Sequence, residues 1–409
     1  MKRPQLILLV VLGVLVLAGG AVAGTMAFGG DANEEPQAAT QNTPASTKDT
    51  PATGDLNTCA GLVQDEGRAC YSKELAAIVN GAADPLAAVE GITQAAYADK
   101  SGFMLANCHG IMHTVAREYA LRTHLTLAKL MDNLPATNDP GCSAGYAHGL
   151  VTAVAPEIEK AGPTVANKLC AESESRYQRY SCTHGFGHAF MRLNSDNIAP
   201  ALQMCGQLCT GAAPDCAQGI YHDYWFSING IDDTTKPKDP VTDPRQLCGA
   251  QPAEYVRPCW YRAFVETANG TRVESAAQFE ELCGGLEGLQ RHACVTGASV
   301  IGPPDPRNQL TVCAQLEDVQ DVEACIRGTK VQNLLNFDPQ LRIDLIQDCN
   351  KTFQGAIALT CDRWLGKTLG VISDGKFRTD GCPKLPTPSA RKACVAGVKS
   401  MEGPLVTFS

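Results

Sequence analysis

The residues best suited to chemistry are six histidines that share one short repeated phrase. The phrase Cys-x-x-Gly-x-x-His opens at Cys142, Cys182 and Cys216, and a form one residue shorter opens at Cys108. Two of the four copies carry a further histidine four residues before the last. The set is His109, His113, His148, His184, His188 and His222. Residues four apart lie on one face of a helix, and two neutral imidazoles so placed are a common half of a zinc or copper site.

The rest of the chain supplies an internal control for these histidines. Five later segments, opening at Cys259, Cys294, Cys325, Cys361 and Cys394, continue the frame without the histidine. The equivalent positions hold Val265, Val300, Val331, Lys367 and Ser400. The repeated framework therefore does not require histidine there, and we infer that the first few repeats carry an added function.

Spacing between repeats limits how the imidazoles can combine. Packed helices lie about 8 to 10 Å apart, so four successive repeats form a row too long for one ion, whereas neighbours can converge. We expect one trio of His184, His188 and His222, and a second trio that the first three histidines form. A strongly curved array could instead bring all six to one centre. Three imidazoles with an open fourth position are typical of catalytic zinc.

The alternative is that the histidines only pack beside the small glycines or recognise a ligand. His124 and His292 lie outside the phrase and are expected to be ordinary surface or core residues.

Two acids near the histidines are candidates to orient an imidazole or to act as a base on metal-bound water. Asp223 follows His222 directly, and Glu118 follows His113 by five positions. The competing interpretation of Glu118 is a solvated helix face. The segment 227–244, rich in Asp, Pro and Lys, could be a lid or only a surface loop. The sequence contains no nucleophile elbow, phosphate-binding loop or dinucleotide fingerprint.

Nineteen cysteines without a CxxC pair indicate a disulfide framework and an oxidising compartment. Sixteen of them fall into pairs separated by 11 or 12 positions. The expected pairs are Cys59/Cys70, Cys170/Cys182, Cys205/Cys216, Cys248/Cys259, Cys283/Cys294, Cys313/Cys325, Cys349/Cys361 and Cys382/Cys394. Cys108 and Cys142 could bridge each other. Cys209 is then a free thiol, pairs with another chain, or replaces Cys205 in its pair.

The elements that carry these residues are predicted to be helical hairpins. The segment 275–283 has apolar residues at helical spacing, Gly284-Gly285 interrupts it, and helical periodicity resumes over 286–300. Each repeat is thus a first helix ending near one cysteine, a turn, and a second helix bearing the next. A glycine three residues after most second cysteines costs helix stability, so its recurrence indicates close helix packing. Arg262 and Trp364 replace that glycine in two repeats.

We predict an all-α, disulfide-stapled array of α-hairpins over 57–409. Its hairpin period and its paired cysteines, such as Cys283/Cys294, make it similar to the cysteine-stapled helical-repeat proteins of the Sel1 and tetratricopeptide type. That resemblance implies a solenoid with a concave binding face and no particular activity. The alternative architecture is a closed α/α toroid, because Cys108-His109-Gly110 is similar to the zinc-binding Cys-His-Gly of lanthionine-cyclase-like toroids.

The N-terminal part is predicted to export the chain. Residues 1–30 begin with Lys2 and Arg3 and continue in an apolar run long enough to span a bilayer as a transmembrane anchor. A cleaved signal peptide is the alternative, since Ala21-Val22-Ala23 offers a cleavage site. Residues 31–56 read as a disordered linker. The folded domain is expected outside the cell membrane on a single-pass anchor, or secreted.

The sequence predicts an exported protein that binds a transition metal (zinc, copper or iron) through its Gly-x-x-His motifs, and it leaves metalloenzyme activity open. The alternative function is a non-catalytic extracytoplasmic scaffold that binds a protein or a cell-surface polymer on its concave face. A net charge of −9 argues against a nucleic-acid partner.

Overall fold

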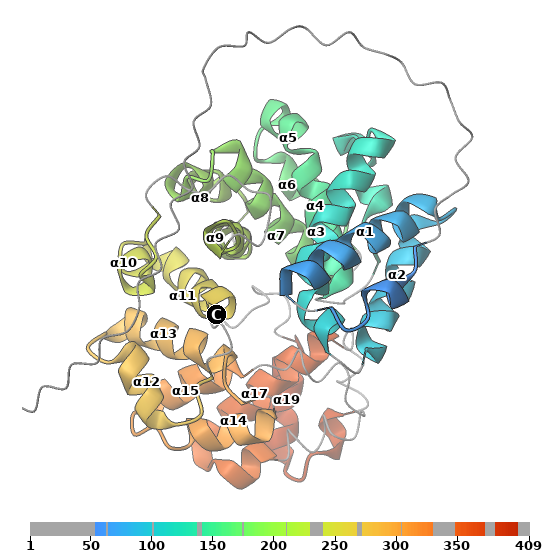
Figure 1. Ribbon diagram of the computed structural model, residues 1–409. Helices are drawn as coiled ribbons and strands as arrows, with labels where there is room; N and C mark the ends of the chain where they lie inside the picture. The colour runs from blue at the N-terminus through green and yellow to red at the C-terminus, as the bar shows by residue number, and fades with distance from the viewer. Residues whose placement is uncertain are drawn as a thin grey trace, which may run out of the picture. The chain divides into compact units, whose positions relative to one another are not determined.

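The computed structural model describes residues 54–399 except 63, 100–101, 137–140, 174–175, 210, 230–239, 268–271, 304, 330–347 and 373–380. Within these residues the secondary structure is helical, without a strand (Figure 1). The all-α prediction is confirmed. The predicted N-terminal segment 1–30, most of the linker 31–56 and most of the possible lid 227–244 lie outside the described residues.

One set of helices bears the second cysteine of each repeat, and consecutive members of this set pack against each other. They are α1 (Gln64–Gly81), α3 (Phe103–Thr123), α4 (Cys142–Ala153), α7 (Arg176–Leu193), α9 (Ala213–Asn229), α11 (Ala253–Thr267), α13 (Gly288–Val300), α15 (Val319–Gly328), α17 (Gly355–Ile372) and α19 (Pro388–Lys399). In addition α17 contacts α7. Whether the full array is a solenoid or a toroid stays a prediction.

Shorter helices precede them and several end at the first cysteine of the repeat. They are α2 (Pro85–Ala98), α5 (Ala155–Ala161), α6 (Val165–Ala171), α8 (Ile198–Cys205), α10 (Pro244–Gly249), α12 (Ala276–Cys283) and α14 (Pro306–Cys313), with 3-10 turns at Leu56–Cys59, Leu127–Lys129, Met131–Asn133 and Cys382–Lys384. Side chains such as Asp84, Asn197 and Asp243 cap the helix starts by accepting backbone N–H bonds. The hairpin expected over 275–300 is present as α12 and α13, and Gly285 between them has a left-handed φ of 75°.

Nine disulfides tie this framework together. Eight join the pairs expected from spacing, each with Cα atoms 5.5 to 5.7 Å apart. The ninth joins Cys108 on α3 to Cys142 on α4, so of the possibilities left open for these two residues the structure has the bridge between neighbouring helices. Among the described cysteines Cys209 is free and exposed. Within the described residues no helix is long and apolar enough to cross a bilayer.

The first pair differs from the other expected pairs in its burial. Cys70 on α1 bonds to Cys59 as its spacing predicted, with Cα atoms 5.6 Å apart. Cys59 is fully buried, whereas Cys70 is only partly buried, unlike every other bridged cysteine of the described residues. α1 begins the set of cysteine-bearing helices, so no earlier member of this described set packs over it. Cysteine spacing alone did not indicate that Cys70 would depart from the buried pattern of the framework.

The repeated glycines allow neighbouring helices to touch backbone to backbone. A Cβ built on Gly145 would collide with the carbonyl oxygen of His109, and one on Gly219 would collide with that of His184. The same contact occurs in repeats without histidine, where Gly297 faces the Trp260 carbonyl oxygen at 2.6 Å from the built Cβ. The expected close packing is therefore part of the architecture, and it brings each histidine-bearing helix against the next.

Candidate metal centre

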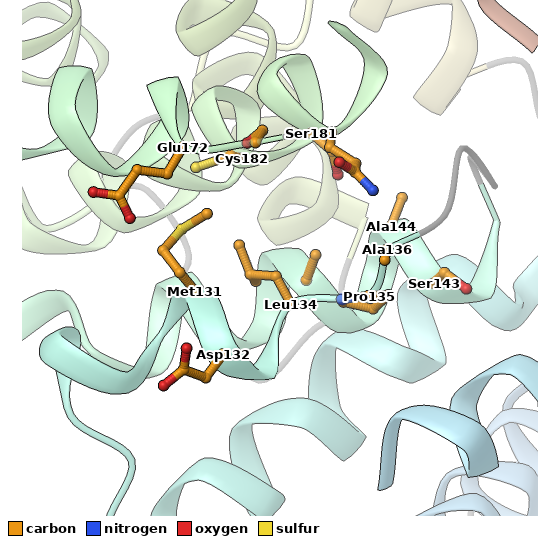
Figure 2. Close-up of a pocket in the computed structure, with 13 residues that line it drawn as sticks. Met131, Asp132, Leu134, Pro135, Ala136, Ser143, Ala144, Glu172, Ser181 and Cys182 are labelled. Atoms are coloured by element: carbon orange, nitrogen blue, oxygen red, sulfur yellow. The ribbon is translucent and has the colours of Figure 1, made fainter. Parts of the chain in front are cut away.

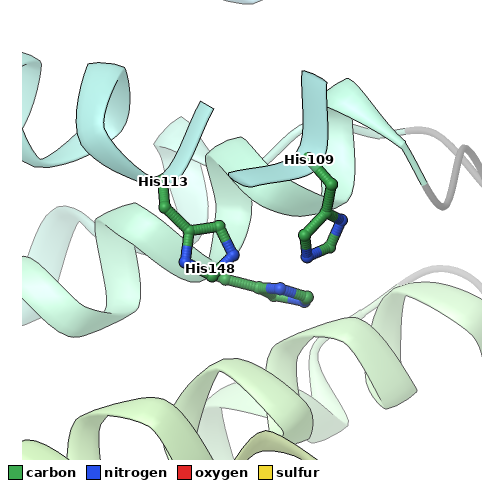
Figure 3. A group of neighbouring side chains, drawn as sticks. All are labelled: His109, His113 and His148. Carbon is green, nitrogen blue, oxygen red and sulfur yellow. The ribbon is translucent and has the colours of Figure 1, made fainter. Parts of the chain in front are cut away.

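Four adjacent helices direct their histidines into a single cluster. α3 supplies His109 and His113, α4 supplies His148, α7 supplies two more and α9 supplies His222. His148 and His184, which lie on the consecutive cysteine-bearing helices α4 and α7, have ring centroids 4.6 Å apart. Side chains of the first and last of these helices also meet, with 5.2 Å between the ring centroids of His109 and His222. The six histidines, which we call the six-histidine cluster, thus form one contiguous group of side chains. Figure 3 shows its α3–α4 part.

Burial of the cluster is nearly complete. Five of its members expose 3% of their surface or less, and His109 is only partly buried. Burial penalises the charged imidazolium, and this lowers the pKa of His113, His148, His184 and His222 well below the usual value, with further lowering from neighbouring positive groups. The pKa of His188 is lowered less, because Asp223 offsets part of the burial effect. These five rings are neutral at physiological pH, which is the form that binds metal.

The clearest orienting contact is between α7 and α9. His188 Nδ1 lies 3.1 Å from Asp223 Oδ1, and Arg192 approaches the same carboxylate oxygen at 3.7 Å. The Nδ1–H therefore donates to Asp223, which leaves the Nε2 lone pair facing the cluster, where this nitrogen has no hydrogen-bond partner. A carboxylate behind an imidazole fixes its tautomer and raises its basicity as a ligand. The sequence pointed to Asp223, although it contacts His188 and not the adjacent His222.

Other buried ring nitrogens likewise have no hydrogen-bond partner. His113 Nε2, His148 Nδ1 and His184 Nδ1 have no hydrogen-bond partner, and the second nitrogen of His148 lies 3.1 Å from Ser181 Oγ. Leaving buried polar atoms unpaired costs about 1 to 3 kcal/mol each, so native proteins rarely do so without a reason. Coordination of a metal would satisfy the ring nitrogens that act as acceptors.

A pair of charged residues on α11 completes the surroundings. His184 Nε2 lies 3.2 Å from His222 Nδ1, and Arg262 reaches the same His184 nitrogen at 3.5 Å. Glu266 lies 3.4 Å from His222 Nε2 and 3.1 Å from the Arg262 guanidinium. Glu266 can accept from His222 Nε2–H, so the two facing nitrogens are His184 Nε2 and His222 Nδ1, and Arg262 can only donate to the former. Their 3.2 Å separation is close to the roughly 3.3 Å between two nitrogens on one tetrahedral zinc.

Sequence reasoning missed Arg262, Glu266 and Ser181 as members of this site. The sequence did contain one signal, since Arg262 stands where most repeats have glycine. Glu118, the other candidate acid, is exposed and accepts a hydrogen bond from Asn80, as the competing interpretation of a solvated helix face implies. A role for Glu118 in orienting an imidazole gains no support from the described contacts.

Donor positions divide into two groups that could each hold an ion. One group is His109, His113 and His148, and the other is His148, His184 and His188. Within each group the ligand nitrogens lie within 4.8 Å of one another. The histidines therefore could hold a metal.

A pocket of about 220 Å³ is lined in part by Ser181 (Figure 2). Met131, Leu134 and Ala144 form part of its wall together with Glu172. Because the Ser181 hydroxyl bonds to His148, this residue connects the pocket to the edge of the six-histidine cluster.

Comparison with known protein families, curated proteins and solved structures finds no match. The resemblance to Sel1-type and tetratricopeptide arrays therefore stays a prediction.

Proposed function

We propose that this protein binds a transition metal at the six-histidine cluster and works outside the cytoplasm. The observation that carries the proposal is a buried group of neutral imidazoles from four helices whose inward nitrogens include several without a partner. Nine disulfides suit an extracellular location.

Packing alone is a weaker explanation of the cluster. A neutral imidazole has one donor and one acceptor nitrogen, and in an interior without water both need partners. Valine occupies the corresponding buried position Val300 in a later repeat, so the framework has an apolar solution available. Retaining six histidines instead is favourable if they share a ligand that accepts their lone pairs.

Donor chemistry limits the ion to the transition metals. Imidazole suits zinc, copper and iron, whereas magnesium and calcium prefer oxygen. Three nitrogens per ion leave a position open, which supports a metalloenzyme as the finer form of the proposal. The N-terminal segment 1–30 would anchor or export the domain, as the sequence indicates.

The experiment is metal analysis of the full chain purified without a histidine tag. We expect bound zinc, copper or iron in stoichiometric amount, and a loss of at least half of it in His188→Ala. His292→Ala is the matched control, because His292 lies on α13 outside the cluster. His188→Gln, which keeps more of the side-chain volume, repeats the test with less disturbance of packing.

Circular dichroism of each variant separates loss of the metal from loss of the fold. A folded wild-type protein that takes up no transition metal at neutral pH would overturn the proposal. It would favour the non-catalytic scaffold that docks a protein or cell-surface polymer.

A further inference from the structure

We propose that the six-histidine cluster holds two metal ions, one on each side of His148. The inference rests on the proposed function, because it concerns how many ions the same cluster binds. The first site consists of His109, His113 and His148. Because His148 Nε2 lies 3.1 Å from Ser181 Oγ, His148 has one nitrogen left for an ion, and the second site takes His184, His188 and His222.

The geometry of the nitrogens argues against a single six-coordinate ion. Six imidazoles around one ion would place every ligand nitrogen within about 4.2 Å of every other, since opposite ligands are separated by two metal–nitrogen bonds. The donor nitrogens instead fall into two groups of three that share His148, namely His109, His113, His148 and His148, His184, His188, and His222 belongs to neither. The 3.2 Å between His184 Nε2 and His222 Nδ1 brings His222 into the second site, where it takes the place of His148.

The number of donors also exceeds what one ion uses. A tetrahedral site takes four ligands, and a catalytic site takes three with one position open. Six imidazoles provide one full set for each of two ions. Ring centroids 4.8 Å apart for His113 and His188 keep the two sets in contact, which suits the short metal–metal separations of two-metal centres.

The two sites differ in what stands behind the imidazoles. In the second site Asp223 orients His188 and Glu266 faces His222, so two carboxylates raise ligand basicity. In the first site Ser181 lies beside His148, and His109 is only partly buried, so a chelator can reach this site more easily. The first site should therefore release its ion to a chelator before the second site does.

Metal stoichiometry tests the proposal on the full chain, stripped with a chelator and reloaded with zinc alone. We expect two zinc ions per wild-type chain and one per chain in His109→Ala, which alters only the first site. His184→Ala should also retain one, whereas the control His292→Ala should retain two. Stepwise chelation of the wild type should remove the two ions in two phases.

Copper loading provides a second measurement that needs no variant. Two Cu²⁺ ions in adjacent sites should give a spin-coupled electron paramagnetic resonance spectrum. One zinc per wild-type chain, or the spectrum of isolated Cu²⁺, would overturn the two-ion proposal and leave metal binding intact. Uptake of neither metal would remove the proposed function as well.

Discussion

Asp223 and the imidazole of His188 show how much a single contact decides at the residue scale. The carboxylate fixes which ring nitrogen carries the proton, and so which nitrogen remains available to an ion. The repeated phrase was sufficient to single out the six histidines whose side chains the structure brings together. It could not predict Glu266 or Arg262, because their roles depend on how α11 lies beside α9, and nothing in the local pattern of α11 reports that.

Stability of the metal-free protein should fall as the pH falls through about 6.5. The pKa of five cluster histidines is lowered in the folded state, so below 6.5 the unfolded chain binds more protons than the folded one. Each such group removes up to about 1.4 kcal/mol of unfolding free energy per pH unit. The carboxylates of Asp223 and Glu266 favour the protonated form of the imidazole beside them, and so they reduce this loss of stability. Arg117, Arg192 and Arg262 repel an imidazolium and increase the loss.

Urea unfolding of metal-free protein at several pH values between about 7.5 and 5.5 measures this effect. His292→Gln should show the wild-type dependence, and His148→Gln a shallower one. An unfolding free energy that stays constant over this range would contradict the prediction.

At the element scale, the glycine of the repeated phrase should be essential wherever it faces a carbonyl. In Gly219→Ala the new methyl group would collide with the His184 carbonyl oxygen, so α9 must move away from α7. We expect a loss of about 1 to 3 kcal/mol in unfolding free energy, as is typical of overpacking, together with weaker metal binding.

Gly91→Ala is the control for this substitution. Gly91 lies within α2 with nothing near the position of a Cβ, so alanine there should stabilise the helix by about 0.5 to 1 kcal/mol. Thermal melting and zinc titration of both variants check the prediction. Equal melting temperatures for Gly219→Ala and the wild type would contradict it.

The elements themselves were largely predictable. Cysteine spacing and apolar periodicity located the hairpin of α12 and α13 to within a few residues, because both signals are local. The approach of α3 to α9, which puts His109 beside His222, was left as one of two alternatives. That approach depends on the crossing angles of several helix pairs in succession, and a periodic sequence pattern does not specify them.

For the whole molecule, disulfides should supply a large part of the stability. Closing a loop of about 12 residues contributes about 3 kcal/mol in the chain-entropy model, and eight such loops recur along the chain. Reduction should therefore lower the melting temperature strongly and release bound metal.

Melting curves with and without reductant, with mass spectrometry to count open bonds, test the expectation. Cys209→Ser should behave as the wild type in both conditions, because Cys209 forms no disulfide with the described cysteines of its own chain. Full reduction without a change in melting temperature would contradict the expected role of the disulfides.

The Cys108–Cys142 bridge differs from the other eight, because it closes 34 residues and ties α3 to α4. Cys108 immediately precedes His109, so this bond fastens the first helix of the six-histidine cluster to its neighbour. In a thiol-reducing cytosol that fastening is missing while the chain is still being made. Oxidation of Cys108 and Cys142 would then have to precede metal uptake, so that a newly made chain would bind metal only in a compartment where these thiols are oxidised.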